Sequence, residues 1–203
     1  DGDEIGDGIR SARKKGHYSK TSDWTKTVQL SWAGMEGLKV GGSVTMNDAP
    51  TTITYDDDNN PLTPEVAWGP IGFTLTEVNA TWSKNNMYAR LENGKIDYDN
   101  NPFAESTSGY YLDLGYNIAD LVGCDDKDLY VWTRTSSYNK DDDDVTTENN
   151  ISLFGVTFKP ADNIAFKLEM GTHEKWDDFD DDPLTAKTKG DVDVMRMGLG
   201  YMF

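Results

Sequence analysis

The chain has 203 residues, which is enough for one domain, and its 36 acidic residues outnumber its 19 Lys and Arg residues. The formal net charge of −17 excludes nucleic acid as a partner, because phosphate binding needs a basic face. The single cysteine, Cys124, excludes both a disulfide framework and a cysteine-based metal site.

A helical membrane protein is also excluded, because no stretch approaches the roughly 20 consecutive apolar residues that a spanning helix needs. The mean hydropathy of −0.67 is compatible with a transmembrane β-barrel, which presents only alternate residues of short strands to lipid. Six Trp and ten Tyr residues are many for so acidic a chain, and they suit the aromatic girdles of such barrels.

Residues 1–23 are rich in Gly, Asp, Ser and Lys and show no convincing strand pattern, which predicts an extended external loop. The strands of the barrel are expected in residues 24–203. The opening residues do not form a signal peptide. We therefore expect either that a signal has been removed or that the sequence begins partway along a longer protein.

Nine stretches alternate apolar and polar residues with a period of two, which is typical of strands with one apolar face. In chain order they are residues 24–33, 38–46, 71–82, 87–92, 110–118, 128–137, 154–159, 164–171 and 194–203. The sixth stretch is aromatic on both faces, so the pattern leaves open whether Tyr130 and Trp132 point into a barrel or out of it. The fold class predicted is an all-β, antiparallel transmembrane β-barrel.

The connections between these stretches alternate in length. Short turns are expected at residues 34–37, 83–86, 119–127 and 159–163, and long, mostly acidic loops at residues 48–69, 97–107, 138–149 and 173–190. Outer-membrane barrels have this sidedness, with short periplasmic turns and long external loops. The acidic loops predict an anionic mouth that concentrates cations, an effect that salt screens.

Aromatic residues gather at the ends of the predicted strands. Those near the short turns are Trp32, Trp82, Tyr116, Phe158 and Phe203, and those near the long loops are Trp24, Phe73 and Tyr110. Two such rings are the expected girdles at the two membrane–water interfaces.

The last strand carries a further pattern, because large apolar residues alternate with small or polar ones up to the final aromatic residue. Arg196, Gly198, Tyr201 and Phe203 resemble the C-terminal signal of Gram-negative outer-membrane β-barrels. The resemblance implies recognition by the barrel-assembly machinery and a place in the bacterial outer membrane. The alternative is an amphipathic edge strand of a soluble sheet, which would invite aggregation.

Residues 26–44, 109–116 and 153–169 resemble hairpins of the phosphate-selective porin family, porins O and P. The resemblance implies a homotrimer of 16-stranded barrels, of which this chain would be the C-terminal half. The odd count of nine strands agrees, because bacterial single-chain barrels have an even number. A closed barrel of eight or ten strands is the alternative. The resemblance supports a porin better than phosphate selectivity, because the basic ladder of the best-known members cannot be matched residue by residue.

If the apolar residues of each strand face lipid, the alternate residues line the lumen. The charged residues predicted to line the pore are Lys39, Glu77, Arg90, Glu92, Asp113, Lys167, Glu169 and Arg196. Four of each sign predict a wet and roughly neutral wall that tunes ion selectivity. Arg134 joins this set only if the sixth strand turns its polar residues inward.

We predict a passive porin for small hydrophilic solutes and ions, with no cofactor, metal site or catalytic residue. Its partners would be outer-membrane lipid and lipopolysaccharide, which the acidic clusters could bridge through divalent ions although they lack EF-hand spacing. One alternative is a barrel that acts as a surface anchor or adhesin through its acidic loops. Another is an enzyme at the rim, with His173 beside Glu174 and Asp177; the second histidine, His17, lies in a predicted loop.

Overall fold

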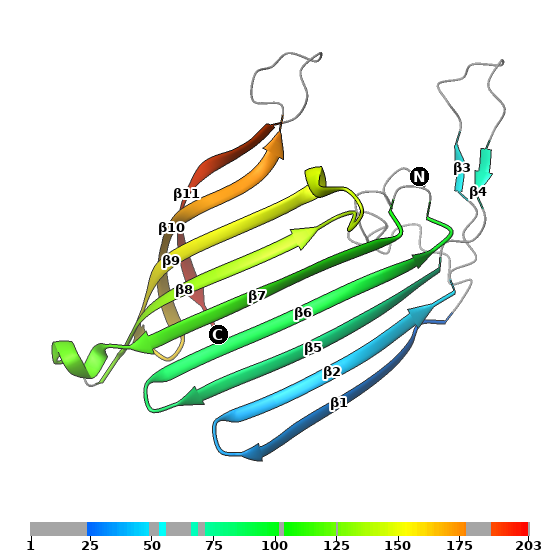
Figure 1. Cartoon of the computed structure of the whole chain (residues 1–203). Helices are drawn as coiled ribbons and strands as arrows, with labels where there is room; N and C mark the ends of the chain where they lie inside the picture. The colour runs from blue at the N-terminus through cyan, green and yellow to red at the C-terminus, as the bar shows by residue number, and fades with distance from the viewer. Residues whose placement is uncertain are drawn as a thin grey trace.

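The computed structural model describes residues 24–48, 53–55, 66–68, 72–101, 104–124, 126–177 and 188–202. Within them, nine antiparallel strands form one curved sheet in which every strand pairs with its sequence neighbours in the sheet (Figure 1). The strands are β1 (Lys26–Met35), β2 (Leu38–Asn47), β5 (Gly72–Lys84), β6 (Met87–Asp99), β7 (Ser106–Asn117), β8 (Asp128–Asn139), β9 (Glu148–Ala161), β10 (Ile164–Asp177) and β11 (Thr188–Tyr201). The described sheet is open, with β1 and β11 as its two edges.

Each of the nine predicted strands coincides with one strand of this sheet, but several strands are longer than predicted. β6 continues to Asp99, and β10 continues to Asp177. The prediction ended them where the apolar residues stop, whereas backbone hydrogen bonds between strands continue through polar residues, as at Lys175, which pairs with Asn149. The loops predicted at 97–107, 138–149 and 173–190 were therefore too long.

Three connections also contain regular structure that was not predicted. β3 (Ile53–Tyr55) pairs with β4 (Val66–Trp68) inside the predicted loop 48–69. Short 3-10 helices occupy Ala119–Val122 and Val145–Thr147. The predicted external loop 1–23 and the acidic run at 56–58 lie outside the described residues.

The hairpin turns gather at one end of the strands and the longer connections at the other (Figure 1). Between β5 and β6, Asn85 and Asn86 have φ angles of 54° and 64°. Two consecutive left-handed residues form the turn type whose twist matches that of a β-hairpin, and Asn tolerates this conformation. At the β1–β2 turn, Gly37 alone has a positive φ, 84°, which glycine adopts without steric cost.

The pairing register divides the side chains of the sheet into an apolar face and a polar face. On the apolar face, eight of these nine strands expose large hydrophobic side chains. The exception is β8, which contributes the less exposed Leu129 and Val131. The most exposed side chains are Met197 at 82%, Leu30 at 77%, Met195 and Leu199 at 69% and Val28 at 64%. Few hydrophobic residues of the described part are buried, namely Ala104, Ala119, Trp132 and Leu153. Among the described residues, the sheet therefore has no second layer, and none of them covers its apolar face.

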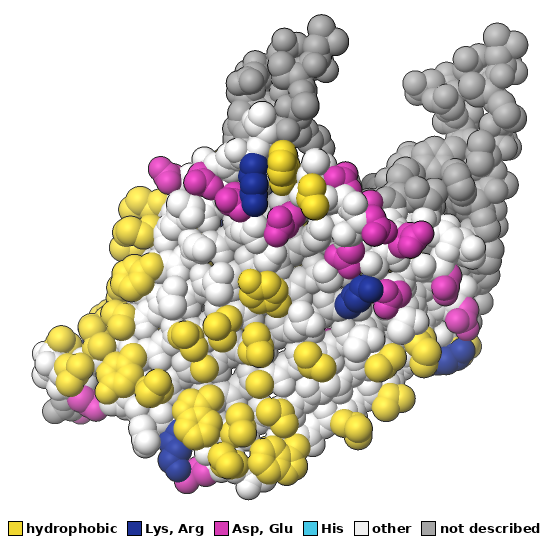
Figure 2. All heavy atoms as spheres, in the orientation of Figure 1, with side chains coloured by type: hydrophobic (Ala, Val, Ile, Leu, Met, Phe, Trp, Pro, Cys, Tyr) yellow, Lys and Arg dark blue, Asp and Glu magenta, His cyan; other side chains and the backbone are white. Residues whose placement is uncertain are grey.

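The hydrophobic residues form a band rather than covering the whole face. In Figure 2, they occupy the lower part of the visible face, and acidic side chains follow the upper part, toward the long connections. We call this region the apolar band. A band of this kind fits lipid between two aqueous layers.

The band crosses the hydrogen-bonded rows obliquely, which gives the tilt of the strands. The row that contains Val28 and Val44, inside the band, continues across the sheet to Glu148 of β9. On β9 the band ends at Phe154, so the edge of the band has moved six residues along the strand from Glu148. Six steps from one strand to the next lead from β1 to β9. A shift of about one residue per strand corresponds to a tilt of roughly 35°, the value of membrane barrels.

Candidate functional site

The polar face of the sheet carries all the charged residues predicted to line the pore. The pairing register places Lys39, Glu77, Arg90, Glu92, Asp113, Lys167, Glu169 and Arg196 on this face. It also decides the orientation that the sequence left open, because Tyr130, Trp132 and Arg134 lie on the polar face as well. Phe73 was expected in the aromatic girdle near the long loops, and this prediction was wrong. Phe73 lies on the polar face, where it pairs with Asn47 and Tyr98.

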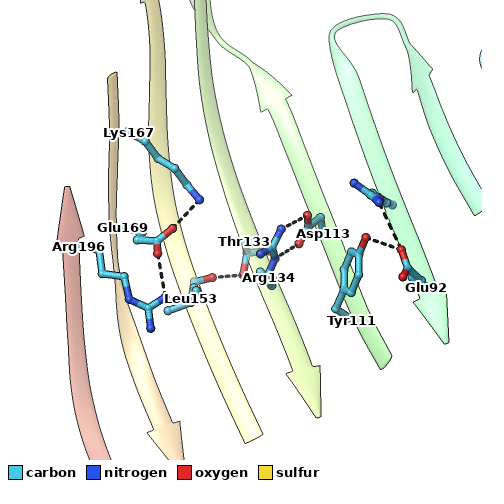
Figure 3. A network of polar contacts seen from close by, with 10 residues as sticks. Glu92, Tyr111, Asp113, Thr133, Arg134, Leu153, Lys167, Glu169 and Arg196 are labelled. Atoms are coloured by element: carbon cyan, nitrogen blue, oxygen red, sulfur yellow. Dashed lines mark hydrogen bonds and ion pairs between the residues drawn. The ribbon is translucent and has the colours of Figure 1, made fainter. Parts of the chain in front are cut away.

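The central contact of the polar face is an ion pair between neighbouring strands. Arg134 of β8 pairs with Asp113 of β7, with Nε 2.5 Å from Oδ1 and Nη2 2.6 Å from Oδ2 (Figure 3). Asp113 is only 6% exposed. The planar guanidinium thus satisfies both carboxylate oxygens, and the buried acid keeps a partner of opposite charge.

Tyr111 connects this pair to the next charged residues along the sheet. The Cζ atoms of Arg90 and Arg134 each lie 5.3 Å from the centre of its ring. Its hydroxyl donates to Oε2 of Glu92 at 2.8 Å, and Nη2 of Arg90 lies 3.3 Å from the same oxygen. Two cations flank one aromatic ring, so both are held by cation–π attraction as well as by carboxylates.

A second cluster lies on β10 and β11. Glu169, 7% exposed, accepts contacts from Nζ of Lys167 at 2.6 Å and Nη1 of Arg196 at 3.2 Å (Figure 3). Nζ of Lys167 also lies 4.4 Å from the centre of the Trp132 ring. Two cations therefore share one buried carboxylate, and the cluster keeps a net positive charge.

Large rings on the polar face lie where the neighbouring strand has a glycine. A Cβ atom at Gly155 would be 2.1 Å from the Trp132 ring, and one at Gly115 would be 2.0 Å from the Tyr88 ring. Each ring therefore lies flat against the wall over a glycine. Tyr88 and Tyr111 were absent from the predicted pore-lining set, and the side that Trp132 faces was left open. For Tyr88 and Trp132, a glycine paired across from the ring is the signal of a wall residue.

At the β2 end, the polar face is less strongly paired. Glu77 accepts hydrogen bonds from Ser43 at 3.2 Å and from Asn79 at 2.5 Å. Lys39 forms no ion pair with any residue that the structure describes.

The described side chains make the polar face slightly basic rather than neutral. Its basic residues are Lys39, Arg90, Arg134, Lys159, Lys167, Lys175 and Arg196, and its acidic residues are Glu77, Glu92, Asp113, Asp128 and Glu169. Arg134 was left open by the prediction, and Lys159, Lys175 and Asp128 were absent from the predicted set. In a chain with a net charge of −17, acidic residues are concentrated elsewhere.

Of the acidic residues predicted to surround the mouth, those at 141–144 lie in the described part of the chain, and most of them form hydrogen bonds within the protein. Asp142 accepts hydrogen bonds from Ser106 at 2.7 Å and Ser108 at 2.6 Å. Asp141 accepts from the backbone N–H of Asp143 at 3.1 Å, and Asp144 from that of Thr146 at 2.8 Å. Three of these four carboxylates therefore stabilise the connection itself, and the side chains of the acidic run 177–182 lie outside the described residues.

Two charged groups pair on the apolar face beyond the apolar band, outside its membrane-spanning part. Nζ of Lys189 lies 2.7 Å from Oε1 of Glu174, which also accepts from Asn150 at 3.1 Å. The hydrogen bond from Lys189 lowers the pKa of Glu174, and the same bond raises the pKa of Lys189.

His173, the candidate for a catalytic rim, lies beyond the band on the polar face. Its Nε2 lies 2.9 Å from Oδ1 of Asn149, while Glu174 points to the opposite face. Burial, followed by the charge of Lys175, lowers the pKa of His173. The described residues bring together no group of three His, Cys, Asp or Glu side chains that could hold a metal ion. His17 and the side chain of Asp177 lie outside them.

The residues of the C-terminal signal divide between the two faces. Arg196 and Gly198 lie on the polar face, and Tyr201 lies on the apolar face with 59% of its surface exposed. Phe203 lies outside the described residues. No helix in the described part of the chain is long and apolar enough to cross a membrane.

An antiparallel meander with an exposed apolar band, tilted strands and a charged opposite face has the architecture of an outer-membrane β-barrel protein. The chain is similar in structure to OmpT (in-vitro folded), an outer membrane protein of Vibrio cholerae, with a TM-score of 0.51 and 15% sequence identity. The alignment covers 87% of this chain and 55% of that chain, so this chain spans about half of its length. The fold and the apolar band together place the chain in the bacterial outer membrane.

No family model matches the chain, and neither does any curated protein sequence. The resemblance to the phosphate-selective porin family therefore gains no support from these comparisons. They support the broader class, an outer-membrane β-barrel.

Proposed function

We propose that the chain forms the wall of a porin, a water-filled channel for passive diffusion of small hydrophilic solutes and ions. The observation that supports this most directly is the belt of charged side chains on the polar face, from Glu77 on β5 to Arg196 on β11. Charged side chains in lipid are costly, so a belt of them at the depth of the apolar band belongs beside water. In a barrel, that water is inside.

The arrangement of the belt suits passive transport. Lys167 lies over the Trp132 ring, and Arg90 and Arg134 flank Tyr111, so the long basic side chains are held close to the wall. Most of their charges are paired with Glu92, Asp113 or Glu169. Such a wall leaves a lumen open and binds no small ion tightly, which passage requires.

Several further features belong to the same proposal. The hairpin turns would be periplasmic and the longer connections external. The functional protein would be a homotrimer in contact with outer-membrane lipid and lipopolysaccharide. It would act without a cofactor and without catalysis.

Conductance in planar lipid bilayers tests the channel. We expect stable ohmic steps from the purified protein, and a matched pair of cysteine variants on β2 sharpens the result. In a Cys124→Ser background, Ser43→Cys is on the polar face and Val44→Cys on the apolar face. A charged, water-soluble methanethiosulfonate reagent should lower the step size of the Ser43→Cys channel and leave the Val44→Cys channel unchanged.

Protein that inserts into vesicles with its strand content intact but gives no ionic steps would contradict the channel. Tight binding of a surface component by that silent protein would favour the alternative, a surface anchor. Equal effects of the reagent on both cysteine variants would contradict the assignment of the two faces.

A further inference from the structure

The polar face has a hollow where two glycines meet. Gly94 of β6 and Gly109 of β7 are paired and lie on the polar face, so the wall lacks two neighbouring side chains there. The hollow has a volume of about 380 Å³, and Glu92, Thr107, Tyr111 and Tyr138 are among the residues that line it. This is within the range of small-molecule sites, about 300–1,000 Å³.

The side chains around the hollow combine aromatic surface with hydrogen-bonding groups. Tyr138, on the same hydrogen-bonded row as the two glycines, is 39% exposed. Tyr111 lies on the adjacent row, beside Glu92. Aromatic surface with a few converging polar groups is the usual composition of a small-molecule site.

Glu92 offers hydrogen-bond acceptors without a strong net charge. Its Oε2 is held by the Tyr111 hydroxyl at 2.8 Å and by Nη2 of Arg90 at 3.3 Å. The guanidinium offsets the negative charge, and a carboxylate has about four acceptor positions, so capacity for further hydroxyl donors remains. An uncharged solute with hydroxyl groups matches this environment better than a cation or an anion does.

We propose that the hollow is a subsite for an uncharged, hydroxylated ring, such as a pyranose sugar. The ring would lie over Gly94 and Gly109, with its C–H face against a tyrosine ring and its hydroxyl groups toward Glu92 and Thr107. This inference rests on the proposed channel, because a water-filled lumen is what brings a solute to the polar face. Binding should be weak, since a transport subsite must release its solute.

Gly94→Leu tests the subsite by filling it. A Cβ atom at Gly94 has no neighbour closer than 3.8 Å, the carbonyl oxygen of Thr76, so the wall accepts a side chain there. Gly200→Leu is the matched control, because Gly200 is also on the polar face and the nearest neighbour of its Cβ is also 3.8 Å away, at Ala165. Methyl β-D-glucoside is the probe, and binding to the whole chain in detergent micelles is measured by saturation-transfer NMR.

We expect saturable binding of the glucoside to the unmodified chain, at least tenfold weaker binding to Gly94→Leu and unchanged binding to Gly200→Leu. Tyr138→Ala should weaken binding severalfold. Choline and citrate, added in excess, should not displace the sugar.

The subsite is overturned if the unmodified chain shows no saturable binding, if Gly94→Leu binds as well as the control, or if choline or citrate competes equally well. Because binding is measured without ion flow, a failure of the subsite is distinct from a failure of the channel. Ionic steps without sugar binding would reject the subsite alone. Sugar binding sensitive to Gly94→Leu in a protein without ionic steps would reject the channel and leave the site.

Discussion

The two faces of the sheet are built from alternate residues of the same strands, yet they are stabilised in different ways. On the apolar face, neighbours such as Leu168 and Met197 are paired across strands and are exposed at 36% and 82%. Their shared property is hydrophobicity, and lipid supplies the surrounding medium. On the polar face, several large side chains have a particular partner, such as Asp113 for Arg134 or Gly155 for Trp132.

This difference predicts which substitutions each face tolerates. The apolar face needs a class of residue at each position, so exchanges among apolar residues should have small effects. The polar face depends on specific pairs and on glycines that lie under aromatic rings, so even conservative exchanges at those positions should be measurable. The largest effects should nevertheless come from placing a charge on the apolar face, because lipid provides no partner for it.

Adjacent residues of β1 give the sharpest comparison of the faces. Leu30 lies in the apolar band and is 77% exposed, whereas Gln29 lies on the polar face. Leu30→Arg should lower the free energy of unfolding by about 2–4 kcal/mol, the cost of an Arg near the bilayer midplane. Gln29→Arg should change it by about 0.5 kcal/mol or less. Urea unfolding in lipid vesicles measures both, and equal losses would contradict the division into faces.

The Asp113–Arg134 pair is the next most sensitive point. Asp113→Ala leaves the guanidinium without its buried partner. We expect a loss on the order of 2 kcal/mol, below the 3–5 kcal/mol of a fully buried pair, because the Arg134 side chain is 38% exposed.

Replacing both members of this pair is the control. The double variant Asp113→Leu with Arg134→Leu should recover most of the loss, since no charge is left unpaired. The same unfolding measurement applies. If the double variant is as unstable as Asp113→Ala, the unpaired charge is not the cause.

The difference between the two faces also explains which features of the structure could be predicted from the sequence. The nine strands and the apolar face were predictable because a period of two can be read within each strand alone, and every strand needs apolar residues where it faces lipid. The orientation of β8 was not, because Trp132 and Val131 are both large and apolar and only the pairing with β7 and β9 separates them.

The wall contacts show the same limit. Lys39, Arg90 and Glu169 could be assigned to the polar face from alternation alone. The contacts of Arg90 and Glu169 could not, because a pair such as Glu169 and Arg196 depends on the register between two strands, which alternation within one strand does not fix. Phe73 was misplaced for a related reason: an aromatic residue near a strand end can lie on either face.

Gly155 allows a smaller effect to be tested. Its added Cβ would lie 2.1 Å from the Trp132 ring and 2.8 Å from the carbonyl oxygen of Leu168. Gly155→Ala should therefore displace the ring and cost about 1–3 kcal/mol through overpacking. Gly198→Ala is the control, with the nearest neighbour of its Cβ at 3.9 Å. A Trp132→Ala exchange should make Gly155→Ala less costly, and strictly additive losses would show that the ring is not involved.

The smallest expected effect comes from the pair of Glu174 and Lys189 beyond the apolar band. The pKa of Glu174 is lowered by Lys189, so its contribution to stability is present above the ordinary Glu pKa and is lost as the pH falls through the lowered value. The pKa of Lys189 is raised by Glu174, so its contribution is present below the ordinary Lys pKa and is lost as the pH rises through the raised value. The contribution should thus be constant between these limits.

Glu174→Gln should accordingly be slightly less stable than the unmodified chain at neutral pH and indistinguishable from it in acid, where both side chains at this position are uncharged. High salt should remove the difference at neutral pH as well, because the pair is exposed and screened. Unfolding curves in vesicles at acidic and neutral pH, each at low and high salt, measure this. A difference that persists in acid or in high salt would assign the effect to side-chain packing between β10 and β11 rather than to charge. The Glu174–Lys189 pair would then resemble the contacts of the polar face, which depend on particular partners.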